Sequence, residues 1–266
     1  MKHTALLLFI VLSLTRGQDG ASEAGPFTID WEREAWIAGG GVLLGTAALA
    51  ADRDFAPPTP ADLAALDRSS VNGFDRFAAG RYSSSQMVMS DVTAALAIAS
   101  PLALALDERV RSDWMTAAVL YAEVGLYSGI VPFIAKGAVR RYRPYTYAAD
   151  APMEERQDPD AIRSFFSGHA TRSFAPAVLT AVMYQEYFPD SPHRTLVWSA
   201  CLGTAALCSA LRISSGAHFP TDVLAGAAVG SAIGYIIPAM HKRKAGIVLT
   251  PLLLRDGHGI ALQVRF

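Results

Sequence analysis

The 266-residue sequence has few charged residues and almost no cysteine. Charged residues make up 18% of the chain, against roughly 25% in an average soluble protein, and the net charge is −1 at pH 7. This near-zero net charge gives no basis for nucleic-acid binding. The only cysteines, Cys201 and Cys208, would lie about 10 Å apart on one helix, which is too far for a disulfide. No cysteine–histidine spacing resembles a zinc site, so no metal is expected.

Hydrophobic residues, in contrast, make up 52% of the chain, and the mean hydropathy is +0.26. The apolar run at residues 5–14 is shorter than the roughly 20 residues of a membrane span and is typical of a signal peptide or an uncleaved anchor. The run at 35–51 is rich in glycine and alanine and is a weak span candidate. Five longer runs follow, at 87–106, 114–135, 173–188, 196–211 and 223–240. Together they predict an all-α bundle of five or six apolar, transmembrane helices.

The C-terminal residues alternate between apolar and polar side chains, as in a β-strand. Asp256-Gly257 favours a tight turn before them, so a short C-terminal β-hairpin is predicted to pair with residues 246–254. The chain then divides into four regions. Residues 1–17 are the signal peptide or anchor, 18–85 an N-terminal segment with a weak apolar helix and an exposed loop, 86–244 the helical core, and 245–266 the hairpin. Within the exposed loop, Pro60 favours the start of one short helix.

Some charged residues lie in or between the apolar runs without forming a motif. Asp91 is interpreted as solvated near a helix end, whereas Glu123 either lines a polar site or is solvated. Four histidines lie in tails or links and are interpreted as solvated, namely His3, His193, His241 and His258.

The first motif joins Lys136 to Arg143, two helical turns later, so that both side chains leave one helix face. Pro144 biases Arg143 away from helical geometry and places its guanidinium at a helix end. Two fixed cations at this spacing suit a phosphate group, which arginine can bind through two hydrogen bonds. The simpler interpretation is a basic flank of a membrane helix.

The second motif, Ser167-Gly168-His169, stands directly before an expected helix. Backbone N–H groups at a helix N-terminus bind anions, glycine lets the backbone come close, and Ser167 can donate a hydrogen bond or cap the helix. His169 would then lie beside a bound anion with a proton to donate. The simpler interpretation is an ordinary helix cap followed by an exposed histidine.

The third motif, Arg212, His218 and Asp222, lies around the link between the last two apolar runs. Arg212 supplies a third cation. Asp222 can accept a hydrogen bond from one nitrogen of His218 and leave the other nitrogen free as a nucleophile or base. The simpler interpretation is a capping histidine and an acid at a helix N-terminus. Together the motifs offer the charge clamps, nucleophile and proton donor that phosphoryl transfer needs.

The patterns K-x6-R-P, S-G-H and R-x5-H-x3-D, in this order, resemble the motifs of the type 2 phosphatidic acid phosphatase (PAP2) superfamily. The resemblance covers about residues 114–242 and implies a helical, metal-independent phosphatase without a cofactor. The phosphate oxygens would be bound by Lys136, Arg143, Ser167, Arg212 and the backbone of Gly168. His218 would form a phosphohistidine and Asp222 would orient it. His169 would protonate the leaving oxygen before water hydrolyses the intermediate.

The resemblance also implies that the substrate is a phosphate monoester or diphosphate, with a lipid phosphate favoured by the apolar helices. Three other functions fit the same residues: a lipid phosphotransferase, a vanadium-dependent haloperoxidase, and a non-catalytic lipid-binding membrane protein. Haloperoxidases of this type are generally longer and soluble, and the intact motif residues argue against a non-catalytic protein.

Basic residues at 241–244 follow the last apolar run and favour a cytoplasmic end there. Counting back through five spans puts both motif-bearing loops on the periplasmic or extracellular face of a bacterial-type cell membrane. An exported N-terminus agrees with this arrangement only if residues 35–51 do not cross the membrane.

Overall fold

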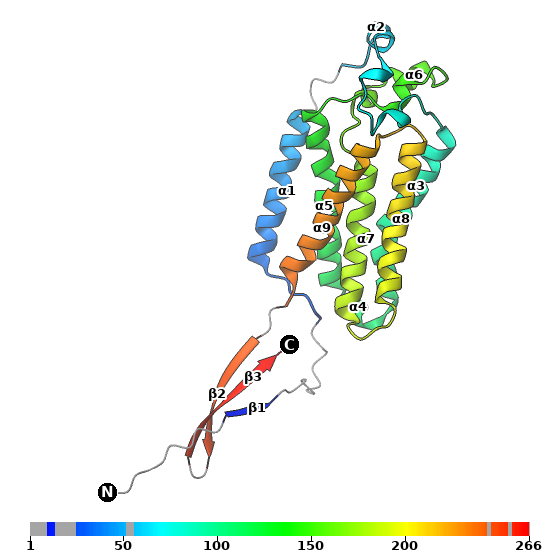
Figure 1. Cartoon of the computed structure of the whole chain (residues 1–266). Helices are drawn as coiled ribbons and strands as arrows, with labels where there is room; N and C mark the ends of the chain where they lie inside the picture. The colour runs from blue at the N-terminus through cyan, green and yellow to red at the C-terminus, as the bar shows by residue number, and fades with distance from the viewer. Residues whose placement is uncertain (1–9, 14–24, 52–55, 244–245, 255–256, 266) are drawn as a thin grey trace.

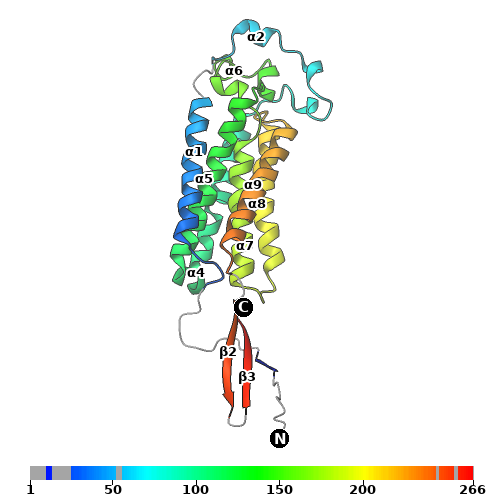
Figure 2. The same cartoon turned by 90° about the vertical axis from the view of Figure 1, so that its left-hand side faces the viewer.

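The computed structural model describes residues 10–13, 25–51, 56–243, 246–254 and 257–265, and of the strands and residue 51 only the backbone. Six long helices stand side by side in these residues and form an elongated bundle (Figures 1 and 2). In chain order they are α1 (Trp31–Ala51), α3 (Ser84–Ala99), α5 (Trp114–Ala138), α7 (Gly168–Tyr187), α8 (Arg194–Ser214) and α9 (Pro220–His241). The all-α core therefore agrees with the sequence-based prediction.

Short elements connect the long helices. They are α2 (Pro60–Ala64), η1 (Arg68–Ser70), η2 (Arg76–Ala78), η3 (Ser100–Leu106), α4 (Glu108–Ser112), η4 (Pro144–Tyr147), α6 (Met153–Arg156) and η5 (Pro159–Ile162). The predicted helix at Pro60 is α2, which Thr59 caps by accepting a hydrogen bond from the backbone N–H of Asp62.

Four helical segments of the described chain are long and apolar enough to cross a membrane: Ser84–Leu106, Trp114–Ala138, Arg194–Ser214 and Pro220–His241. Only 22% to 33% of each apolar stretch is buried inside the bundle, so most of its apolar surface faces outward. Exposed Val88 and Leu96 on α3 and exposed Leu224 and Ile236 on α9 illustrate this outer surface. An apolar exterior of this extent is stable in lipid, which supports a membrane location for the chain.

The prediction of five or six apolar spans exceeds these four by α7 and the weak candidate α1, and α7 is less apolar than the four. α7 occupies the centre of the bundle, where it contacts α3, α5, α8 and α9. A central helix never meets lipid, so it can carry polar side chains that neighbouring helices satisfy. Thr180 shows this, because its hydroxyl lies 2.8 Å from that of Ser100 at the end of α3. α1 begins with charged residues and packs along α5, where the hydroxyl of Tyr127 donates to the carbonyl of Ile37.

A row of glycines brings α9 against the backbone of α7. Gly226, Gly230 and Gly234 are spaced one helical turn apart and buried. A Cβ atom at Gly226 or Gly230 would lie 2.5 Å from the carbonyl oxygen of Ser167 or Thr171, respectively. This small-residue spacing is the usual way for membrane helices to approach closely.

The segment before α3 is less exposed than the sequence analysis predicts. Residues 52–55 of the predicted exposed loop lie outside the described residues, and the remainder covers one end of the bundle (Figure 1). Val71, Ala78 and Ala79 are buried and pack against Phe219, at the start of α9. Asp75 is fully buried in the same place. The hydrophobic contact with Phe219 therefore holds this segment over the loop between α8 and α9.

Three strands form a small sheet at the other end of the bundle, in the order β1-β3-β2. β2 (Gly246–Leu254) pairs antiparallel with β3 (Gly257–Arg265), and β1 (Ile10–Ser13) pairs parallel with β3. β1 was not predicted and falls within the expected signal peptide or anchor, whose other residues lie outside the described ones. Whether that segment is cleaved stays a prediction.

The glycine row allows a direct test of the contact between α7 and α9. We expect Gly230→Ala to destabilise the folded protein by about 1–3 kcal/mol, because the added methyl group overlaps the α7 backbone. The matched control is Gly125→Ala in α5, where an added Cβ would meet nothing within 4 Å. Because alanine has a higher helix propensity than glycine, we expect this variant to be slightly more stable than the wild-type protein. Thermal unfolding in detergent measures both, and equal midpoints for the two variants would contradict the close approach.

Candidate active site

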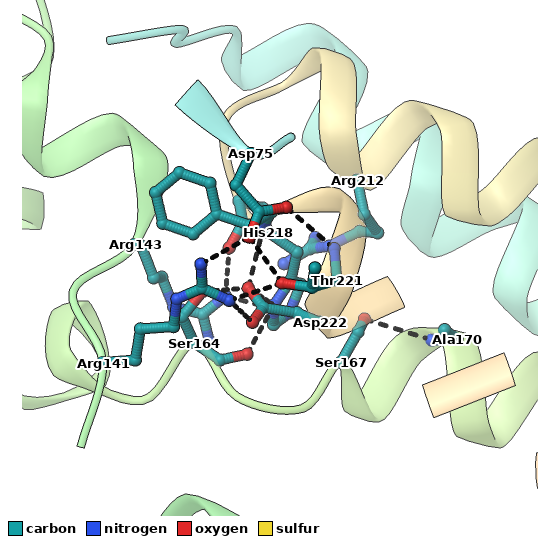
Figure 3. Close-up of polar contacts among 12 residues, drawn as sticks. Asp75, Arg141, Arg143, Ser164, Ser167, Ala170, Arg212, His218, Thr221 and Asp222 are labelled. Atoms are coloured by element: carbon teal, nitrogen blue, oxygen red, sulfur yellow. Dashed lines mark hydrogen bonds and ion pairs between the residues drawn. The ribbon is translucent and has the colours of Figure 1, made fainter. Parts of the chain in front are cut away.

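The three motifs meet at the end of the bundle that the segment before α3 covers (Figures 1 and 3). Lys136 lies in the last turn of α5, Ser167 caps α7, Arg212 lies in the last turn of α8, and Asp222 lies in the first turn of α9. Arg143 has extended backbone angles, as Pro144 requires. Backbone N–H of Ser167 donates to the carbonyl of Asp222 over 3.0 Å, so the second and third motifs are joined directly.

His218 is almost completely buried, with 1% of its surface exposed, and its two partners define its tautomer. Nδ1 lies 2.8 Å from the carbonyl oxygen of Ser164, which can only accept, so Nδ1 carries the hydrogen. Nε2 lies 3.1 Å from Nη1 of Arg143, which can only donate, so Nε2 presents its lone pair. Burial, followed by the positive charges of Arg143, Arg212 and Lys136, lowers the pKa of His218 well below its ordinary value. The imidazole is therefore neutral, and the lone pair of Nε2 accepts a hydrogen bond from Arg143 and points toward the cations.

Asp222 does not make the direct hydrogen bond to His218 that the sequence analysis predicts. Its Oδ2 lies 3.7 Å from Nδ1 of the histidine. That oxygen instead accepts from the hydroxyl of Ser164 over 2.5 Å and from the backbone N–H of Phe219 over 2.8 Å. Asp222 thus holds the two segments that carry His218 and its carbonyl partner, so its influence on the imidazole is indirect.

Lys136 and Arg143 meet at the carboxylate of Asp160, from the acidic loop after the first motif. Nη2 of Arg143 lies 2.5 Å from one carboxylate oxygen, and Nζ of Lys136 lies 3.8 Å from the other. Burial alone would raise the pKa of Asp160, but the charges of Arg143 and Lys136 hold it below its ordinary value. A carboxylate therefore remains charged at neutral pH in the position where the two cations converge.

His169 and Arg212 meet at a second carboxylate, that of Asp91 on α3. Nε2 of His169 lies 2.9 Å and Nη1 of Arg212 lies 3.7 Å from the same oxygen of Asp91. Arg212 also donates to the hydroxyl of Ser90 over 3.1 Å, while its buried Nε has no hydrogen-bond partner among the described residues. Asp91 is exposed, as predicted, but its charge faces the second and third motifs and is not simply solvated.

Ser167 begins α7 as the second motif predicts, since its hydroxyl accepts a hydrogen bond from the backbone N–H of Ala170 over 3.3 Å. Gly168 is the first residue of the helix and is buried. The atom nearest to a Cβ placed there is Nη2 of Arg172, at 3.4 Å. Arg172 is thus one more cation beside this helix N-terminus, and the sequence analysis did not identify it.

The sequence analysis also missed a buried network behind His218, built from Arg141, Asp75 and Thr221 (Figure 3). One nitrogen of Arg141 donates to Asp222 over 2.5 Å and to the hydroxyl of Thr221 over 2.8 Å, and another donates to Asp75 over 2.7 Å. Asp75 also accepts from the backbone N–H and the hydroxyl of Thr221, over 3.0 and 2.6 Å. The guanidinium carbon of Arg141 lies 4.3 Å from the ring centre of Phe219. Arg141 therefore bridges two buried acids and aligns the first turn of α9.

The site combines clustered cations, a helix N-terminus and a neutral histidine whose Nε2 lone pair faces the cations, which suits the binding of a phosphate-like anion. Residues 117–245 match the sequence model of the family described as the PAP2 superfamily. This segment belongs to the PAP2 superfamily. All three motifs lie within it, whereas Asp75 and Asp91 lie before it.

One solved structure resembles the chain: the first transmembrane PAP2 type phosphatidylglycerolphosphate phosphatase from Bacillus subtilis. The two chains share 18% sequence identity with a TM-score of 0.47, and the similarity covers 78% of this chain and 94% of that chain. No curated protein matches the sequence.

The contact of Asp160 with both cations of the first motif predicts competition with a bound anion. Asp160→Asn removes the negative charge, so we expect inorganic phosphate to bind about 5- to 30-fold more tightly at neutral pH. Isothermal titration in detergent measures the dissociation constant. The control is Asp150→Asn, at an exposed position of the same loop, which should leave phosphate affinity unchanged. Unchanged or weaker phosphate binding by Asp160→Asn would show that the carboxylate does not compete.

Proposed function

We propose that the protein is a membrane-embedded phosphatase that hydrolyses a lipid phosphate monoester or diphosphate through a phosphohistidine. The observation that carries this proposal is the orientation of His218, whose Nε2 lone pair points to Arg143 while Nδ1–H is held by the carbonyl of Ser164. A neutral imidazole with its lone pair among cations can attack an anion that the same cations bind.

In the proposed reaction, phosphate oxygens displace the carboxylates of Asp160 and Asp91 from the cations of the three motifs. Nε2 of His218 forms a bond to phosphorus while the bond from phosphorus to the leaving oxygen breaks. The imidazolium form of His169 transfers a proton to that oxygen and becomes neutral, and the phosphohistidine that forms at His218 keeps its Nδ1–H on the carbonyl of Ser164. Water then attacks phosphorus, loses its proton to His169 and releases inorganic phosphate, which restores the neutral His218.

The residues of the site suit this chemistry without a metal. Lys136, Arg143 and Arg212 supply fixed positive charge for the equatorial oxygens, which is the task that a metal ion performs in other phosphoryl-transfer enzymes. Asp222 contributes through Ser164 and the backbone of Phe219, which it holds in place. Its proposed role is to position the histidine and its partner rather than to contact the imidazole.

A lipid substrate fits because the site lies at one end of a bundle whose exterior is apolar. Acyl chains can remain among lipids while the phosphate reaches the cations at the end of the helices. The opposite end carries Lys242 and Arg243, which favours the cytoplasmic side for that end. We therefore place the site on the periplasmic or extracellular face. In this arrangement α1, which runs along the bundle, starts on the cytoplasmic side, and residues 1–17 would be retained rather than exported.

The nucleophile can be tested with purified protein in detergent. His218→Ala should reduce phosphate release by more than about 10³-fold, because no other group can form the covalent intermediate. The substrates to compare are phosphatidic acid, phosphatidylglycerol phosphate, undecaprenyl diphosphate and an aryl phosphate. The control His193→Ala removes an exposed histidine before α8 and should retain full activity. Near-normal turnover by folded His218→Ala would refute the mechanism, and activity on the aryl phosphate alone would refute the lipid specificity.

A second test addresses the buried network. Asp75→Asn keeps the shape of the side chain but removes the charge that holds Arg141, so we expect kcat to fall about 10- to 100-fold through misplacement of the α9 start. KM should change little, because Asp75 does not contact the cations of the motifs in this structure. The same steady-state assay measures both constants, with the exposed Asp62→Asn as the control for a change in the same segment. An unchanged kcat would show that the network is dispensable for turnover.

A further inference from the structure

A second cluster of buried ionisable residues lies at the end of the bundle opposite to the candidate active site. It consists of Glu34 near the start of α1, Glu123 on α5 and His241, the last residue of α9. Each glutamate is 8% exposed and the histidine is completely buried. The 22 residues of α9 separate His241 from the start of that helix by about 30 Å, so the cluster is separate from the phosphate site. The sequence analysis interpreted His241 as solvated, and the structure corrects this.

The orientation of His241 is set by its own helix. Nδ1 lies 2.8 Å from the carbonyl oxygen of Ile237, so Nδ1 carries a hydrogen and Nε2 faces away from the helix. Nε2 lies 3.1 Å from Oε2 of Glu34 and 3.3 Å from Oε2 of Glu123. Such an imidazole, with Nδ1–H on a backbone carbonyl and Nε2 directed at other ligands, has the usual arrangement of a metal-binding histidine.

Three electron-pair donors thus converge in a buried place. Arg33 binds Glu34 over 2.9 Å and offsets one of the two negative charges, so the other must be offset by a bound cation or by a proton. A proton on Nε2 can make one strong hydrogen bond, which goes to Glu34. Oε2 of Glu123 would then stay without a hydrogen-bond partner, as it is among the described residues. A metal ion would satisfy all three donors at once.

The spacing of the donors fits such an ion. With metal–ligand distances of about 2.0–2.2 Å, neighbouring ligand atoms lie about 3.0–3.5 Å apart. The distances of 3.1 and 3.3 Å from Nε2 to the two carboxylate oxygens fall in this range, and all three atoms lie within 4.8 Å of one another. One imidazole with two carboxylates favours a first-row transition ion such as Zn²⁺ over Mg²⁺ or Ca²⁺, which prefer oxygen ligands alone.

We propose that Glu34, Glu123 and His241 bind one divalent transition-metal ion that joins α1, α5 and α9. The ion has a structural role, because it lies far from the phosphate site and connects a helix before the PAP2 segment to two helices within it. An open groove on the surface is lined by Arg33, which binds Glu34, and by Met240, the neighbour of His241.

The test uses full-length protein in detergent with a purification tag that contains no histidine. After treatment with Zn²⁺ and removal of the excess, mass spectrometry of the metal should find close to one Zn²⁺ per chain. Glu123→Gln, which keeps the side-chain shape, should lower the affinity for Zn²⁺ by at least about tenfold. Glu108→Gln, an exposed glutamate at the start of α4, is the matched control and should retain the ion.

Two results would overturn the proposal: folded wild-type protein that binds no Zn²⁺, or Zn²⁺ that remains equally tightly bound in Glu123→Gln. The first would assign the compensation to a proton on His241 or Glu123 in place of a metal ion. If Glu123→Gln fails to fold, the wild-type protein decides, since Zn²⁺ should raise its thermal midpoint and Co²⁺ should give the absorption bands of nitrogen and oxygen ligation. These readouts do not depend on turnover, so they are independent of the phosphatase assay.

Discussion

The close contact between α7 and α9 is the constraint on which the candidate site depends. Gly226 lies against the carbonyl of Ser167, and the backbone N–H of Ser167 donates to the carbonyl of Asp222. The helix that starts with the second motif is therefore fixed in register with the helix that starts after His218. A larger residue at Gly226 would separate Ser167 from the start of α9. The geometry at the phosphate site thus originates in helix packing, which depends on small residues that take no part in any chemistry.

Positive charge is the second constraint, because cations placed this closely repel one another unless acids lie among them. The structure contains two kinds of acid for this purpose. Asp75 and Asp222 are fully buried and form ion pairs with Arg141, at a place that a bound ligand would not reach. These ion pairs therefore stay in place whether or not an anion is bound. Asp91 and Asp160 are more than half exposed and contact the cations of the motifs. An incoming anion can displace these exposed acids without disturbing the buried ones, so anion exchange does not require the site to unfold.

The motifs were readable from the sequence because their residues are close along the chain and stand at helix ends. Ser167 as a helix cap, Pro220 as the first residue of α9 and the extended backbone of Arg143 all follow from local rules, and the structure has each of them. The hydrogen bond from Arg141 to Asp75 could not be predicted from such local rules, because the two residues are 66 positions apart in the sequence. In addition, Asp75 lies in a polar segment whose composition predicts exposure to solvent. His241 was missed for a similar reason, because its burial comes from α1.

The two polar clusters lie at opposite ends of the bundle because its long helices are apolar in between. A charged group near the middle of an apolar helix must be satisfied inside the protein, whereas a group near a helix end can also reach the interface. α9 has Asp222 in its first turn and His241 at its last residue, and the other residues of its buried face include the three packing glycines. The contacts along the middle of this helix are therefore apolar and close. Polar contacts at the two ends of α9 determine what it packs against. Its first turn contacts the motif residues, and its last residue contacts α1.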